Sequence, residues 1–172
     1  MKKVLFVFVA LISMLAMTSC DDKEKCVGTW VSETISEGGF SGNVYLTLRE
    51  NDHVTLAIKG SGVNEEDGLS AEVAFTIKVD GKWDASLGSL DLELSQDDVR
   101  FSIDKFDTGD EEMNALIQLG LSDPETKKEL IGELKNDFNV DDLNGSLSIN
   151  FKDDNTMELT DGSGDTMVLH RK

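Results

Sequence analysis

The sequence predicts a mainly β protein: an antiparallel up-and-down β-barrel of about eight to ten strands with a two-helix insertion. From residue 27 onward, apolar residues occupy alternate positions in short stretches, a pattern typical of strands that bury one face. Residues rich in Gly, Asn and Asp separate these stretches, and only residues 107–139 change to a helical period. Closing the sheet covers the apolar face and removes unpaired edges, although a sandwich of two sheets is the alternative.

The expected strands follow one another along the chain and are joined by brief turns. Asn51-Asp52 and Asp80-Gly81 each indicate a hairpin, and residues 161–165 are expected to join the last two strands. Residues 82–86 are expected to form a short strand of their own. The alternating apolar faces comprise Val44, Leu46 and Leu48; Val54, Leu56 and Ile58; Val73, Phe75, Ile77 and Val79; Leu90, Leu92 and Leu94; Val99, Phe101 and Ile103; and Leu147, Ile149 and Phe151.

The insertion at 107–139 is expected to contain two amphipathic helices. Thr108 followed by Glu111 resembles a capping box, which predicts that the first helix begins there. Pro124, the only proline of the chain, predicts the first turn of a second helix, where its missing N–H costs little. Each helix has one apolar stripe, so we expect both to lie against the barrel, most naturally at its mouth.

The N-terminus predicts a secreted protein. Two lysines precede the apolar stretch 4–17, which is too short to cross a bilayer and is typical of a signal peptide. Residues 17–20, Met-Thr-Ser-Cys, resemble a bacterial lipobox, and this resemblance implies cleavage after residue 19 and acylation of Cys20. An ordinary signal peptide with a chance cysteine is the alternative. Acyl chains on Cys20 would hold the protein on a membrane.

The domain organisation follows from this processing: a signal peptide at 1–19, a lipidated cysteine and acidic tether at 20–26, and a barrel domain at 27–172 with its insertion. The acidic run after Cys20 is similar to signals that send some lipoproteins to the bacterial cell surface. We therefore expect an outer-membrane lipoprotein of the cell envelope, exposed at the surface; retention in the inner membrane is the alternative. The net charge of −18 excludes nucleic acid as a partner.

Gly28-Thr29-Trp30 begins the first expected strand and resembles the G-x-W motif of lipocalins. In that family the tryptophan plugs one end of the barrel and stacks on a basic residue near the last strand. The resemblance implies that Trp30 is the plug and that Arg171 is its partner, with a cation–π contact between them. The helical insertion departs from the lipocalin pattern, in which a helix follows the final barrel strand.

No motif for catalysis, metal binding or a cofactor is found in the sequence. The two histidines, His53 and His170, are not in ligand spacing, and no nucleophile motif accompanies them. If Cys20 is acylated, Cys26 has no partner for an intramolecular disulfide, and it is either a buried small apolar residue or an exposed thiol. We therefore expect no enzyme, no catalytic residue, no metal and no cofactor.

Two functions follow as hypotheses. In the first, an anchored barrel binds a small apolar ligand whose contact residues the sequence does not identify. In the second, the barrel has a solid core and docks an envelope protein as a structural or interaction module. In both cases the N-terminal lipid is the contact with the membrane.

Overall fold

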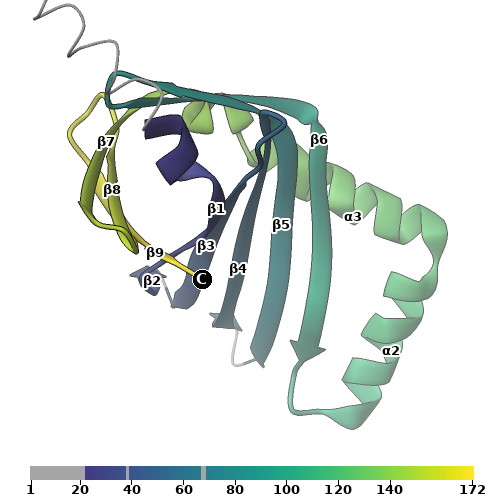
Figure 1. The fold of residues 1–172 in the computed structure, drawn as a ribbon. Coiled ribbons are helices and arrows are strands. Elements are labelled where there is room, and N and C mark those ends of the chain that lie inside the picture. Colours follow the sequence, from purple (N-terminus) through teal and green to yellow (C-terminus); the bar gives the residue numbers. More distant parts are fainter. Residues whose placement is uncertain (1–21, 38, 67–68) are drawn as a thin grey trace, which may run out of the picture.

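A computed structural model describes residues 22–37, 39–66 and 69–172. The strands within these ranges form one nine-stranded sheet in the order β1-β9-β8-β7-β6-β5-β4-β3-β2, and β1 also pairs with β3. All pairings are antiparallel, and the β1–β3 pairing closes the sheet into a ring that leaves β2 outside (Figure 1). The expectation of a mainly antiparallel β fold is therefore confirmed, with one sheet rather than the two of a sandwich.

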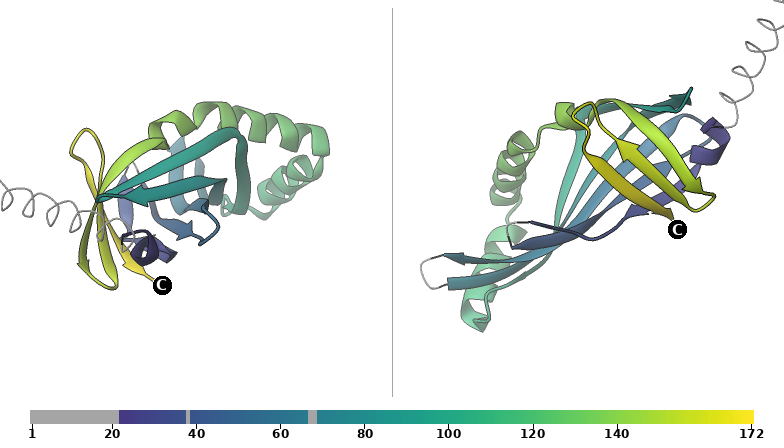
Figure 2. Two further views of the ribbon diagram at one scale, coloured as in Figure 1. Left: turned by 45° about the horizontal axis from the view of Figure 1, so that its top comes forward. Right: turned by 90° about the vertical axis from the view of Figure 1, so that its left-hand side faces the viewer.

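The bounds of the elements show that the middle strands are long. The strands are β1 (Gly28–Ser32), β2 (Ile35–Glu37), β3 (Phe40–Leu48), β4 (His53–Glu66), β5 (Leu69–Ser86), β6 (Ser89–Asp107), β7 (Gly145–Asp153), β8 (Thr156–Thr160) and β9 (Thr166–Arg171). The helices are α2 (Glu111–Ser122), α3 (Pro124–Asp137) and the 3-10 helix η1 (Val140–Leu143). A further helix covers residues 22–26. Because β4, β5 and β6 continue beyond the ring, one side of the sheet extends as an open, curved flap (Figures 1 and 2).

The prediction of a hairpin at Asp80-Gly81 is wrong. Both residues lie inside β5, where the pairing with β6 shifts between Val79 and Gly81 as in a β-bulge. A Cβ at Gly81 would collide with the carbonyl oxygen of Glu93 on β6, so the glycine permits close approach of two strands rather than a turn. Residues 82–86 are consequently the end of β5 and not a separate strand.

Two other turn predictions are confirmed. Asn51-Asp52 joins β3 to β4, and Asp52 has a φ of 62°, a left-handed conformation that Asp tolerates better than most residues. Residues 161–165 join β8 to β9. The Asp161 carboxylate stabilises this loop by accepting hydrogen bonds from the backbone N–H groups of Ser163 (2.8 Å) and Asp165 (2.9 Å).

The insertion contains the two expected helices, but the first begins later than predicted. Asp110, not Thr108, is the N-cap of α2, and its carboxylate accepts hydrogen bonds from the N–H groups of Glu112 and Met113. Thr108 instead donates its hydroxyl to the side chain of Asn114. The second helix begins at Pro124 as expected, with Asp123 as N-cap.

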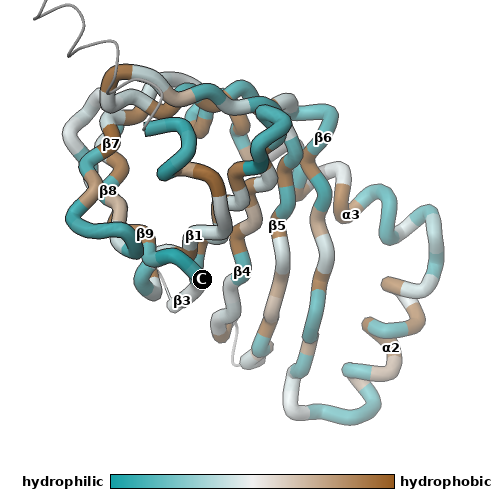
Figure 3. The backbone as a smooth tube through the Cα atoms, in the orientation of Figure 1, coloured by the Kyte–Doolittle hydropathy of each residue, from teal (hydrophilic) through white to brown (hydrophobic). Residues whose placement is uncertain are grey.

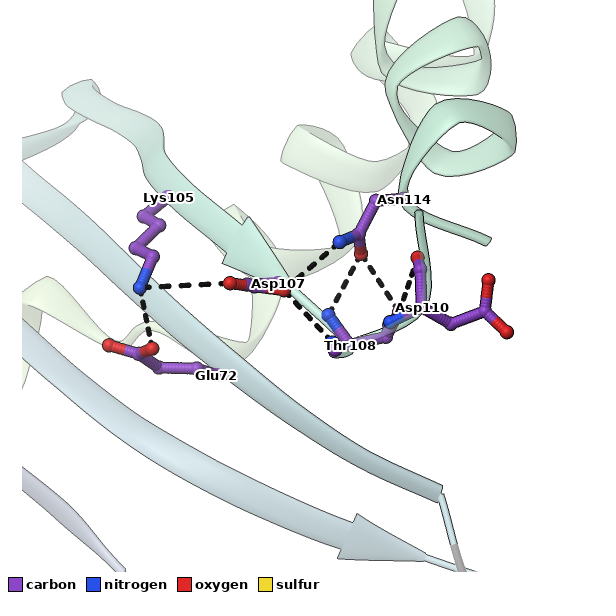
Figure 4. A network of polar contacts seen from close by, with 7 residues as sticks. Glu72, Lys105, Asp107, Thr108, Asp110 and Asn114 are labelled. Carbon is purple, nitrogen blue, oxygen red and sulfur yellow. Dashed lines mark hydrogen bonds and ion pairs between the residues drawn. The ribbon is translucent and has the colours of Figure 1, made fainter. Parts of the chain in front are cut away.

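A polar network joins the end of β6 to α2. Asp107, the last residue of β6, accepts hydrogen bonds from the N–H of Gly109 (2.9 Å) and the amide of Asn114 (3.0 Å). These hydrogen bonds lower the pKa of the Asp107 carboxyl. Lys105 connects the same carboxylate to Glu72 on β5 (Figure 4). The network therefore sets the direction in which the chain leaves the sheet.

The insertion lies along the free edge of β6 rather than over an end of the ring. β7 pairs only with Ser89–Leu92 of β6, so the following part of that strand lacks a strand partner on this side. At Leu94 the side-chain amide of Asn144 takes the place of the missing neighbouring strand. It accepts a hydrogen bond from the Leu94 N–H (2.6 Å) and donates one to the Leu94 carbonyl (3.0 Å). Gln96 donates to the carbonyls of Lys135 and Phe138. Side-chain amides thus connect the edge of β6 to α3 and η1.

The core lies inside the ring. Apolar side chains at alternate strand positions point inward, and Figure 3 shows the resulting alternation of hydrophobic and hydrophilic positions. Trp30, Leu46, Leu90, Met157 and Leu169 are among the largest side chains that are fully buried. Outward-facing positions carry most of the charge, as in the ion pair between Lys152 and Glu158 (2.7 Å).

Candidate functional site

One end of the ring is filled by Trp30. The indole is 0% exposed, and the residue is paired across the strands with Arg171 of β9. The Arg171 guanidinium lies 4.2 Å from the centroid of the indole ring, a distance at which a cation–π interaction is strong. Phe151 of β7 packs on the indole with a centroid separation of 6.2 Å. The structure therefore brings together the two residues that the resemblance to lipocalins paired.

Hydrogen bonds connect this pair to the segment that precedes β1. The indole N–H of Trp30 donates to the Cys26 carbonyl at 2.7 Å. Arg171 donates to the carbonyls of Val27 (2.7 Å) and Lys25 (2.6 Å). Gly28, the first residue of β1, has a φ of 142°. A Cβ on this residue would lie 2.6 Å from the Arg171 guanidinium. Glycine is thus required by both the backbone conformation and the space available.

The residues before β1 differ from the solvated tether expected at 20–26. Residues 22–26 form a helix that packs on the Trp30 end of the ring (Figure 1). Lys23 forms ion pairs with Asp52 (2.7 Å) and Asp84 (2.8 Å) and lies 5.5 Å from the ring centroid of Trp83. The Lys23 ammonium lowers the pKa of the Asp84 carboxyl through their hydrogen bond. Opposite charges on the turn between β3 and β4 and near the end of β5 therefore hold part of the acidic run in place.

Cys26 ends this helix inside the core. Its side chain is 0% exposed, and burial, with a smaller contribution from the charge of Asp22, raises the pKa of the thiol to about 12. Such a thiol carries almost no thiolate at neutral pH and is a poor nucleophile. Of the two alternatives for Cys26, the structure shows the buried apolar residue.

The other end of the ring contains a cavity of about 430 Å³. It lies between β3 and β4 on one side and β7, β8, β9 and η1 on the other. Ten apolar side chains line it: Val44, Leu46, Leu56, Ile58, Leu92, Leu143, Leu147, Leu159, Met167 and Leu169. All of these are buried or half-buried, so they form the floor and walls of the cavity.

The polar lining residues are all exposed and therefore form the rim. They come from two segments, the start of β7 with η1 and the loop between β8 and β9: Asp142, Asn144, Ser146, Asp161, Gly162, Asp165 and Thr166. Three of the seven are aspartates, and no lysine, arginine or histidine lines the described cavity. The cavity therefore combines an apolar interior with an acidic entrance.

The remaining candidate residues lie apart from the cavity. His53 and His170 are exposed, and neither lines it. Within the described residues, no group of three or more His, Cys, Asp or Glu side chains is arranged to hold a metal ion. Cys20 and residues 1–19, for which a signal peptide is expected, lie outside the described residues. Among the helices that the structure does describe, none is both long and apolar enough to cross a bilayer.

The cavity residues themselves were not predicted, although their inward orientation was. Val44, Leu46, Leu56, Ile58 and Leu147 all belong to apolar faces assigned from alternation. The alternation of apolar and polar residues predicts which side chains point into the ring. It does not predict where side chains on opposite strands are too far apart to touch and so leave a cavity. The polar rim had no signal beyond the turn-forming residues of the 161–165 loop.

No protein-family model matches the chain, and no curated protein sequence matches it significantly. Function must therefore be argued from the two ends of the ring: an indole stopper at one and an apolar cavity with an acidic rim at the other.

Proposed function

We propose that this chain is a lipoprotein of the bacterial cell envelope whose ring is a lipocalin-like barrel, and that it binds a small apolar ligand in the cavity near Leu143, without catalysis. Anchoring through acylated Cys20 on the outer-membrane surface completes the proposal. The observation that carries the binding function is the cavity of about 430 Å³ with ten apolar lining side chains.

The size and lining of the cavity suit a small amphiphile. Ligand sites commonly occupy about 300–1,000 Å³ and are mostly apolar with a few polar groups near one side. Each CH₂ group that leaves water for such a site contributes about 0.8 kcal/mol. The half-exposed wall residues, such as Val44 and Met167, are the side chains that a ligand would cover.

The topology supports the lipocalin-like part of the proposal. The ring closes through β1, whose Trp30 is stacked under Arg171, as the resemblance implies for a plug. The helix at 22–26 and the end of β9 lie at this end, whereas η1 lies toward the other (Figure 2). An anchor preceding residue 22 would therefore leave the cavity entrance on the side facing away from the membrane.

Ligand binding can be tested with a neutral fluorescent probe, N-phenyl-1-naphthylamine, and a variant that fills the cavity. Met167→Trp places a bulky side chain on the cavity wall, and Val168→Trp places the same side chain on the opposite face of β9 as a control. We expect Met167→Trp to weaken probe binding at least tenfold and Val168→Trp to leave it nearly unchanged. Equal binding by both variants, or no binding by the unmodified protein, would contradict the proposal.

Anchoring has its own test. We expect Cys20→Ala to release the protein from membranes and to abolish incorporation of labelled palmitate. Protease treatment of intact cells then reports whether the anchored chain faces outward. Continued membrane association of the variant would refute acylation at Cys20 as the anchor.

One observation favours the second hypothesis, a module that docks an envelope protein. Two large apolar side chains of α2 are exposed: Leu116 is 65% and Leu119 is 71% exposed. Cross-linking followed by purification from membranes, compared with lipid extraction of the purified protein, separates the two functions. A stoichiometric protein partner without bound lipid would favour docking.

A further inference from the structure

We propose that the acidic rim makes the cavity selective for apolar ligands with a cationic amine head group and against fatty acids. This inference rests on the proposed binding function and adds the chemical class of the ligand. Three features of the cavity support it. Apolar residues line the interior and polar residues the rim, the rim carries negative charge, and no basic residue in the described lining neutralises that charge.

The separation of the lining orients an amphiphile. Every apolar lining side chain is buried or half-buried, and every polar one is exposed. A ligand with an apolar chain can therefore bury the chain only by entering first with that end. Its head group then remains at the rim, between η1 on one side and the loop between β8 and β9 on the other.

At the rim the head group meets carboxylates from both sides. Asp142 comes from η1, whereas Asp161 and Asp165 come from the loop. Asp161 is already occupied, because its carboxylate accepts the backbone N–H groups of Ser163 and Asp165. In the described part of the chain, neither Asp142 nor Asp165 forms an ion pair. These two carboxylates are therefore available to a ligand.

No positive charge balances the rim. The described lining contains no lysine, arginine or histidine, and Arg171 donates a hydrogen bond to the Lys25 carbonyl at the Trp30 end of the ring. The whole chain carries a net charge of −18, which adds a weak long-range attraction for cations. A carboxylate head would lose hydration and meet only like charges and the neutral side chains of Asn144, Ser146 and Thr166.

The expected selectivity is moderate because the rim is exposed. A single charge contact in water changes affinity severalfold, and salt screens it further. We therefore expect an amine to bind about tenfold more tightly than a carboxylate of the same chain length. A neutral alcohol of that length should fall between them, because it keeps the chain and can donate one hydrogen bond.

The test displaces N-phenyl-1-naphthylamine from the full chain carrying Cys20→Ala, so that no acyl group of the protein competes. Dodecylamine, dodecanol and dodecanoate are titrated below their aggregation limits at low and at physiological ionic strength. The same series is repeated with the double variant Asp142→Asn and Asp165→Asn. Asp154→Asn, the same neutralisation in the turn between β7 and β8 at the Arg171 end of the ring, is the control.

We expect displacement in the order amine, alcohol, carboxylate, with the preference reduced in the double variant and by salt but retained in Asp154→Asn. If all three compounds displace the probe equally, or if dodecanoate is the best, the rim does not select the head group, although the cavity still binds apolar chains. If neither the probe nor any of the three compounds binds to the protein, the proposed function itself is refuted, and this inference with it.

Discussion

The contact between Trp30 and Arg171 can be measured with a double-mutant cycle. The variants are Trp30→Phe, which keeps an aromatic ring but lacks the indole N–H, and Arg171→Met, which keeps a long apolar side chain but lacks the charge. A third variant combines the two changes. Trp30→Ala is added as the most severe substitution at this position.

The expected magnitudes follow from the contacts. Removing a fully buried tryptophan costs about 3–5 kcal/mol, so Trp30→Ala should lower the free energy of unfolding by at least that amount. Trp30→Phe loses the 2.7 Å hydrogen bond to Cys26 and part of the indole volume, and we expect a loss of about 1–2 kcal/mol. Arg171→Met loses the stacking and the bonds to the carbonyls of Val27 and Lys25, and we expect a loss of about 3 kcal/mol.

The cycle measures how much more strongly the guanidinium interacts with the indole than with a phenyl ring, because the bonds of Arg171 to the backbone do not depend on the ring. The guanidinium lies 4.2 Å from the ring centroid. We therefore expect the double variant to lose about 1 kcal/mol less stability than the two single variants lose in sum. Urea unfolding followed by circular dichroism supplies the free energies. The fluorescence of Trp83, the buried tryptophan that the variants retain, reports the same transition.

Two results would refute this reasoning. If Trp30→Ala changed the free energy of unfolding by less than about 1 kcal/mol, the indole would not be packed as described. If the losses of Trp30→Phe and Arg171→Met added without any coupling, the guanidinium would not favour the indole over a phenyl ring, contrary to the cation–π contact described. Small domains have total stabilities of about 5–15 kcal/mol, so the milder Phe variant should remain folded and measurable.

Three further predictions follow from individual residues. Because Cys26 is buried and its thiol pKa is raised to about 12, iodoacetamide at pH 8 should label it only after unfolding; rapid labelling of the native protein would disprove its burial. Gly28→Ala should destabilise by about 1–3 kcal/mol in thermal unfolding, because of the positive φ and the adjacent guanidinium, whereas Gly120→Ala in α2 should be neutral or stabilising. Asp80 has a lowered pKa, chiefly through the hydrogen bond donated by Thr55. Its contribution to stability is therefore complete above the ordinary aspartate pKa of about 4 and is lost as the pH falls through the lower folded value. The free energy of unfolding of Asp80→Asn should therefore fall less between pH 5 and pH 2 than that of the unmodified chain. If both fell equally, the lowered pKa of Asp80 would be contradicted.

Much of the fold could be predicted because alternation and turn chemistry are local signals. The faces containing Leu46, Leu56 and Leu147 point inward as expected, and the turns at Asn51-Asp52 and 161–165 occur where predicted. These features depend on neighbouring residues only, so a single sequence contains them.

The errors arose where one local signal permits two structures. Asp80-Gly81 is typical of a hairpin, but the same small residue also suits a bulge between long strands, and only the pairing of β5 with Glu93 and Leu94 decides between them. Thr108 and Asp110 are both good N-caps, and the hydrogen bonds of Asn114 and Asp107 select the second. Such choices depend on contacts distant in sequence.

The cavity and the docked helix were beyond sequence reasoning for a related reason. A void forms where side chains on opposite walls do not meet, which depends on the curvature of the whole sheet. The charged composition of residues 20–26 predicts a solvated tether, whereas the described part of it, 22–26, is a helix on the ring. Lys23 holds this helix through Asp52, in the turn between β3 and β4, and Asp84, near the end of β5.

The seam of the ring has a consequence for how the protein folds. β1 is held by β9, and the bond from Arg171 to Val27 spans 144 positions of the chain. β1 can pair with the nearby β3 early, but its pairing with β9 is a late step, because β9 is the last strand of the sheet to be made. Until then Trp30 lacks its contacts with Phe151 and Arg171, and a chain that exposes apolar surface in this state is prone to aggregate.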